Sequence, residues 1–148
     1  MINYRFLIGC LAAGALLGTV AGCGPGNPAE GPVVGVHGRL TNAGQPLAVQ
    51  GMDGGEGMIR ITFIKYEGEG KAVAASDTYS ALVDARGNFK FSGRFGNGIP
   101  PGKYRVSVRQ WEPYPQKDLL GGKFDEQHSP IFREVTGKEP LEIDLSKP

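Results

Sequence analysis

The chain has 148 residues, of which 16 are basic, 15 are acidic and 24 are glycine. Because the charges balance, the chain lacks the dense basic surface that nucleic-acid-binding proteins usually carry, and we expect no nucleic-acid partner. The two cysteines, Cys10 and Cys23, lie near the start of the chain, so the remainder has no thiol for a disulfide, a nucleophile or a metal.

Residues 1–22 have the pattern of an export signal. Arg5 precedes an apolar run from Phe6 to Val20 that is broken by glycines. The run falls short of the roughly 20 apolar residues that a membrane-spanning helix needs. We therefore expect a signal peptide that is removed.

The sequence VAGC at positions 20–23 resembles the lipobox of bacterial lipoproteins. The resemblance implies that Cys23 carries the lipid and becomes the first mature residue; the alternative is an ordinary signal cleavage beside a passive Cys23. Residues 23–32, rich in glycine and proline, predict a flexible tether. Gly24 replaces the aspartate that marks inner-membrane retention in some bacteria. We therefore expect an exported protein that is lipid-anchored to a bacterial membrane, with an outer membrane or cell surface favoured over the inner membrane, which stays open as the alternative.

From Pro32 onward the apolar residues alternate with polar ones, which is typical of half-buried β-strands. The clearest alternating segments are residues 33–40, 59–66, 88–93, 103–111 and 141–146. Turn residues rich in glycine, proline and asparagine separate them, and no helical period is long enough to connect parallel strands. The sequence therefore predicts an all-β fold, a single antiparallel β-sandwich of about seven strands over residues 33–148.

The sequence LVDARGNFKFSG, followed by IPPGKYRVSV, resembles carboxypeptidase regulatory-like domains. This resemblance implies a transthyretin-like, or prealbumin-like, β-sandwich over residues 33–148. The chain departs from that pattern at residues 51–58 and at the long connection 112–130. We expect either segment to be able to carry a function particular to this protein.

The side chains that could perform catalysis are few. The only histidines are His37, on the outer side of a predicted strand, and His128, in a predicted loop. There is no zinc motif, no serine in a nucleophile elbow and no cysteine after Cys23. We therefore expect no enzyme, no cofactor and no metal site, with a histidine pair binding metal as the alternative to two solvated histidines.

The candidate binding residues lie around the end of the predicted strand 103–111. Trp111 shares the outer phase of that strand with Arg105 and Arg109, so it should lie outside the core. Exposed aromatic residues beside arginine are typical of protein-binding hot spots, and we predict a partner or ligand patch of Trp111, Tyr114, Phe124 and Arg109.

Two interpretations of this patch remain open, together with a structural one. A protein partner, such as another envelope protein, would accept a mixed surface. A carbohydrate or other small ligand, such as an envelope polysaccharide, is the alternative, and a glycan would need two or three coplanar aromatic rings. The third possibility is that the loop folds back and Trp111 caps the sandwich, with Arg109 stacked on it.

Overall fold

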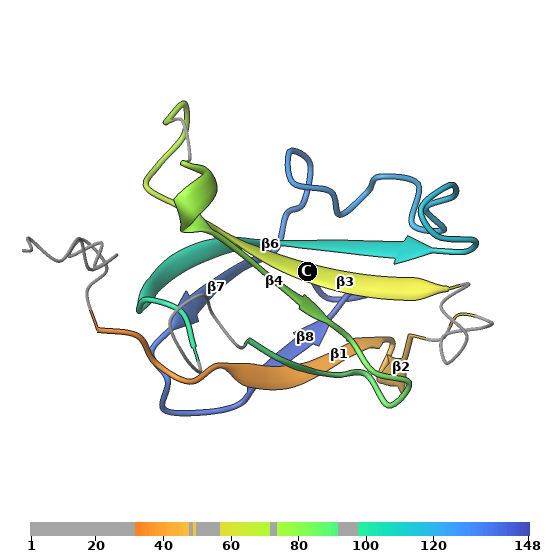
Figure 1. The fold of residues 1–148 in the computed structure, drawn as a ribbon, viewed down its shortest axis with the longest axis horizontal. Helices are drawn as coiled ribbons and strands as arrows, with labels where there is room; N and C mark the ends of the chain where they lie inside the picture. Colours follow the sequence, from red (N-terminus) through yellow and green to blue (C-terminus); the bar gives the residue numbers. More distant parts are fainter. Residues whose placement is uncertain (1–31, 48, 50–56, 72–73, 92–97) are drawn as a thin grey trace, which may run out of the picture.

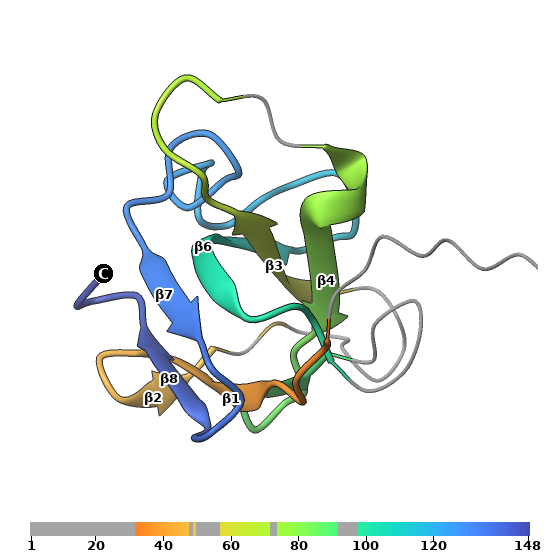
Figure 2. The same ribbon diagram turned by 90° about the vertical axis from the view of Figure 1, so that its left-hand side faces the viewer.

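The computed structural model describes residues 32–47, 49, 57–71, 74–91 and 98–148. These residues form two four-stranded sheets that pack face to face (Figures 1 and 2). The predicted export signal, Cys23 and most of the predicted tether lie outside the described residues.

The first sheet is built around β1 (His37–Asn42). Its partners are β2 (Gln45–Pro46), β5 (Asn88–Lys90) and β8 (Leu141–Asp144). β2 and β5 run antiparallel to β1, whereas β8 runs parallel to it.

The second sheet has the order β4-β3-β6-β7, and every pairing in it is antiparallel. Its strands are β3 (Met58–Lys65), β4 (Thr78–Leu82), β6 (Gly102–Trp111) and β7 (Phe132–Val135). The 3-10 turn η1 (Ala75–Asp77) directly precedes β4.

The structure confirms the all-β sandwich and corrects one detail of it. The antiparallel rule predicted from the sequence fails for β1 and β8, which are paired in parallel from Gly38 to Thr41. The physical reason is the path of the chain: β7 belongs to the second sheet and β8 to the first. A connection that changes sheets is not restricted to the reversal of a hairpin, so β8 can enter in the direction of β1.

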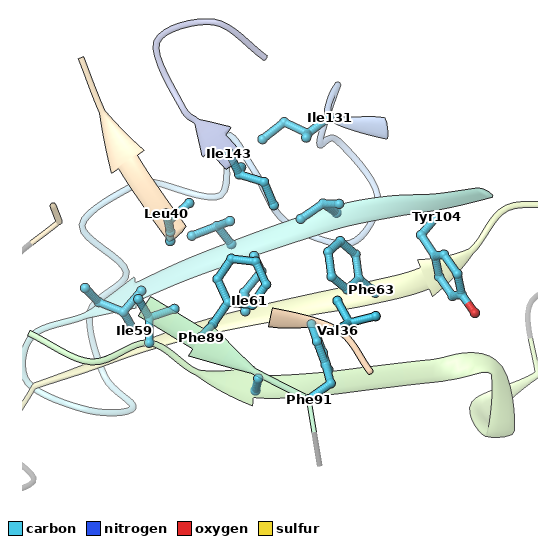
Figure 3. Packing of buried hydrophobic residues seen from close by; sticks show 14 of the residues in the cluster. Val36, Leu40, Ile59, Ile61, Phe63, Phe89, Phe91, Tyr104, Ile131 and Ile143 are labelled. Carbon is cyan, nitrogen blue, oxygen red and sulfur yellow. The ribbon is translucent and has the colours of Figure 1, made fainter. Parts of the chain in front are cut away.

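The core lies between the two sheets and contains the residues that the alternation placed inward (Figure 3). Phe63 lies at its centre, with ring centroids 4.8 Å from Phe91, 5.8 Å from Tyr104 and 6.3 Å from Phe89. Tyr104 is also fully buried, and its hydroxyl donates to the Pro100 carbonyl over 2.7 Å. Aromatic rings from both sheets therefore hold the sandwich together.

The turn between β4 and β5 shows why glycine is required at position 87. Gly87 has a φ of +83°, and a Cβ there would lie 2.5 Å from the Leu40 carbonyl oxygen. Asp84 fixes the turn by accepting hydrogen bonds of 2.8 Å from the backbone N–H groups of Arg86 and Asn88. Left-handed backbone and close approach both exclude a side chain at Gly87.

Candidate functional site

Strand β6 runs along the length of the domain, from the end where the described chain enters to the end that carries Trp111 (Figure 1). Val34, near the start of the described chain, exchanges backbone hydrogen bonds of 2.9 and 3.0 Å with Ile99, just before β6 begins. β6 then runs from Gly102 to Trp111. Figure 1 shows the entering chain and the start of β6 at one end of the sandwich and the arrowhead of β6 at the other. Trp111 is therefore remote from the point where the tether would join the domain.

The connection between β6 and β7 lies along the free edge of β6. Beyond the part paired with β7, the backbone N–H groups of β6 and of the residue that follows it donate to acceptors from this connection. The donors and acceptors are Val106 to Ile131 (2.9 Å), Val108 to Phe124 (2.7 Å), Gln110 to the Asp118 carboxylate (3.2 Å) and Glu112 to Lys117 (2.9 Å). The segment predicted as an irregular connection is therefore a cover for the edge of the sheet.

Phe124 was predicted as part of the exposed patch, and this prediction is wrong. Its side chain is only 3% exposed and belongs to the hydrophobic core. The reason is the edge cover: the Phe124 carbonyl accepts from Val108, so this part of the loop lies against β6 and its ring joins the core cluster. Phe124 is a packing residue of the sandwich.

Arg109 is held by carboxylates and does not stack on Trp111 in the contacts of the described residues. Its Nη2 lies 2.5 Å from Glu126 and its Nη1 lies 3.9 Å from Asp118. The hydrogen bond to Glu126 raises the pKa of Arg109, and the same bond lowers the pKa of Glu126. Arg109 therefore fastens the covering loop to β6.

Trp111 and Tyr114 do come together, and a different arginine joins them. Their ring centroids are 5.3 Å apart with an interplanar angle of 84°. The guanidinium of Arg60, on β3, lies 5.2 Å from the centre of the indole, and its Nη2 contacts the Met58 sulfur at 3.8 Å. We name Met58, Arg60, Trp111 and Tyr114 the Trp111 patch. Trp111 is half-buried and outside the core, and Tyr114 is 37% exposed.

The register of the sheet explains why sequence reasoning missed Arg60. Met58 pairs directly with Trp111, and Arg60 pairs with Arg109, so Arg60 is the diagonal neighbour of Trp111. Long side chains reach such diagonal neighbours across a sheet. Alternation places Arg60 on the outer face of β3, but only the pairing register brings it to Trp111.

A second cluster of aromatic and basic residues lies at the opposite end of the same sheet. Tyr66 and Phe132 meet edge to face at 4.8 Å, and Lys103 and Arg105 lie within about 6 Å of both rings. Lys103 and Arg105 lie on β6, Phe132 lies on β7 and Tyr66 directly follows β3; these residues were not predicted as a site. They cover the outer face of the sheet near the point where the chain enters the domain.

The histidines do not form a site with each other in the described contacts. His37 is exposed on β1, whereas the Nδ1 of His128 lies 2.8 Å from Asp125, whose pKa this hydrogen bond lowers. Within the described residues, no group of three or more potential metal ligands is present. The same residues contain no helix that is both long and apolar enough to span a membrane.

We compared the chain with protein-family models, curated proteins and solved structures, and none of them matched. The resemblance to carboxypeptidase regulatory-like domains therefore remains a prediction from the sequence.

Proposed function

We propose that this protein is a lipid-anchored envelope protein whose β-sandwich acts as a non-catalytic interaction module. The observation that supports this function is the course of β6, which runs from the end where the chain enters to the Trp111 patch. Ten residues of β-strand span about 33 Å. A lipid on Cys23 would thus hold one end of the domain near the membrane while the patch faces outward.

The length of the tether fits this arrangement. Nine residue steps separate Cys23 from Pro32. Such a segment reaches at most about 30 Å when fully extended. The end of the domain at Val34 would therefore stay close to the bilayer, and the Trp111 patch would be available to a partner in the envelope or outside the cell.

The composition of the patch supports a protein partner. Tryptophan, tyrosine and arginine are the residues most enriched in protein-binding hot spots. The alternative, a carbohydrate or other small ligand, receives less support, because Trp111 and Tyr114 meet at 84° and do not offer the coplanar rings of a glycan platform. One face of the indole is also occupied by Arg60.

The anchor is tested by replacing Cys23 with alanine in a bacterial host that processes lipoproteins. We expect the wild-type protein to incorporate radiolabelled palmitate and to sediment with membranes, because lipid attachment requires the Cys23 thiol. The variant should lose the label and leave the membrane fraction. Cys10→Ala is the matched control and should keep both properties. Membrane association of the Cys23 variant without label would contradict the anchor.

The interaction site is tested by placing a photo-crosslinking phenylalanine analogue at position 114 of the full chain in that host. We expect a discrete adduct with an envelope protein, which is lost when Trp111 is also replaced by alanine. The same analogue at Arg39, which is exposed on the other sheet, is the control and should not give this adduct. Because Trp111 is half-buried, its replacement should lower the free energy of unfolding by less than about 2 kcal/mol.

Two results would contradict this function. One is the absence of any adduct at position 114 beyond those at Arg39. The other is a loss of about 3 kcal/mol or more in Trp111→Ala, which would identify the tryptophan as a structural cap. Binding of the purified protein to cell-wall polysaccharide that depends on Trp111 would instead favour the carbohydrate alternative.

A further inference from the structure

The outer face of the second sheet carries three arginines that differ in their partners. Arg109 is paired with Glu126 and Asp118. Arg105 donates to the Gln127 carbonyl over 3.1 Å. Within the described part of the chain, Arg60 contacts only the Trp111 ring and the Met58 sulfur, which is a weak acceptor. Among the residues that the structure describes, Arg60 is therefore a half-buried cation with no oxygen atom within hydrogen-bond distance of its guanidinium.

We propose that the Trp111 patch binds an aspartate or glutamate side chain of a partner protein, and that Arg60 is the residue that receives the carboxylate. This inference rests on the proposed interaction function and specifies the chemistry of the partner. Its basis is charge complementarity: within the described part of the chain, the patch offers one positive charge that has no acidic partner and lies between apolar side chains.

The position of Arg60 over the ring of Trp111 would prepare the guanidinium for such a ligand. A guanidinium placed over an aromatic ring interacts through its flat face, which leaves the N–H groups at its rim free to donate. Those groups match the two oxygens of a carboxylate in a bidentate arrangement. Because the indole already restricts the arginine, less side-chain entropy is lost when the carboxylate binds.

The surroundings of Arg60 indicate which acidic segments would fit. Met58 and Trp111 are half-buried beside it, and Tyr114 is 37% exposed. These side chains can bury apolar neighbours of the bound carboxylate, which would also strengthen the ion pair by excluding water. We therefore expect the partner segment to carry an acidic residue next to an aromatic or aliphatic one.

The test uses peptides selected from a random phage-displayed library against the purified full chain in detergent. Binding of synthetic versions is measured by the fluorescence of Trp111, the only tryptophan in the chain. We expect the selected peptides to share an acidic residue beside an apolar one. Changing that residue to its amide should weaken binding about tenfold or more, as expected for a charge-assisted hydrogen bond.

Variants of the protein locate the carboxylate. Arg60→Gln should weaken binding of the acidic peptide about as much as the amide peptide does, and the two changes together should add little further loss. Arg60→Lys should retain part of the affinity because it keeps the charge. Arg39→Gln, an exposed arginine on the first sheet, is the matched control and should bind like the wild type. Circular dichroism establishes that each variant is folded.

The outcomes separate this inference from the interaction function itself. Peptides that change Trp111 fluorescence without an acidic preference, or that bind Arg60→Gln as well as wild type, would overturn the assignment of Arg60 and leave an interaction site at Trp111. Failure to select any peptide that changes the fluorescence of Trp111 would also overturn the inference. The interaction function is tested separately, by the crosslinking adduct at position 114.

Discussion

Replacing Phe63 with alanine is expected to lower the free energy of unfolding by about 3 to 5 kcal/mol. Phe63 is fully buried on β3, and its ring contacts three other aromatic rings from both sheets. Alanine would leave a cavity that two rigid sheets cannot close, so both burial and aromatic contacts would be lost. Urea unfolding of the full chain in detergent, followed by circular dichroism, measures this change.

Phe63→Leu is the control for this experiment because leucine keeps most of the side-chain volume. It should be considerably less destabilising than alanine, since volume is the quantity that the packing of the core requires. If alanine costs less than about 1 kcal/mol, the aromatic cluster does not hold the sheets together and the assignment of the core at this position is wrong.

Replacing Phe124 with alanine should cost a similar amount, about 3 to 5 kcal/mol. Its ring is 3% exposed, and its backbone carbonyl accepts the hydrogen bond from Val108. Removing the ring therefore opens a cavity at the same place where the loop is fastened to the edge of β6. The same urea unfolding experiment provides the measurement.

Tyr114→Ala is the matched comparison, because it removes an aromatic ring from the same connection at a position that is 37% exposed. We expect it to lower the free energy of unfolding by less than about 1 kcal/mol. Similar losses in both variants would mean that burial does not distinguish packing from binding residues in this loop. An unchanged stability in Phe124→Ala would restore Phe124 as a candidate for the binding patch.

Alternation in the sequence predicted the sandwich well where strands are long and one face is apolar. The inward phase of β3 and β6 is continuous, with residues such as Ile61 and Val106 fully buried. β2, β4 and β7 were not among the predicted alternating segments, because each has few apolar residues to reveal a period of two. The parallel pairing of β1 with β8 could not be predicted from the sequence either, because the direction of a pairing depends on the path of the chain between the sheets.

The candidate site shows the same division between local and long-range information. The outer position of Trp111 followed from the phase of a single strand, and the structure places it outside the core. The inward–outward alternation of side chains along β6 does not continue through a loop rich in proline and glycine. The burial of Phe124 could therefore not be predicted from the sequence. Arg60 reaches Trp111 from 51 positions earlier in the chain, through the pairing of two strands.

The edge cover of β6 affects whether neighbouring copies of this protein can associate through that edge. β6 is ten residues long, and β7 pairs with only its first four. An open remainder would be a template on which a neighbouring chain could add a strand, the first step toward a growing intermolecular sheet. Because the connection to β7 already satisfies these backbone groups, crowding of the proteins would not join them along this edge.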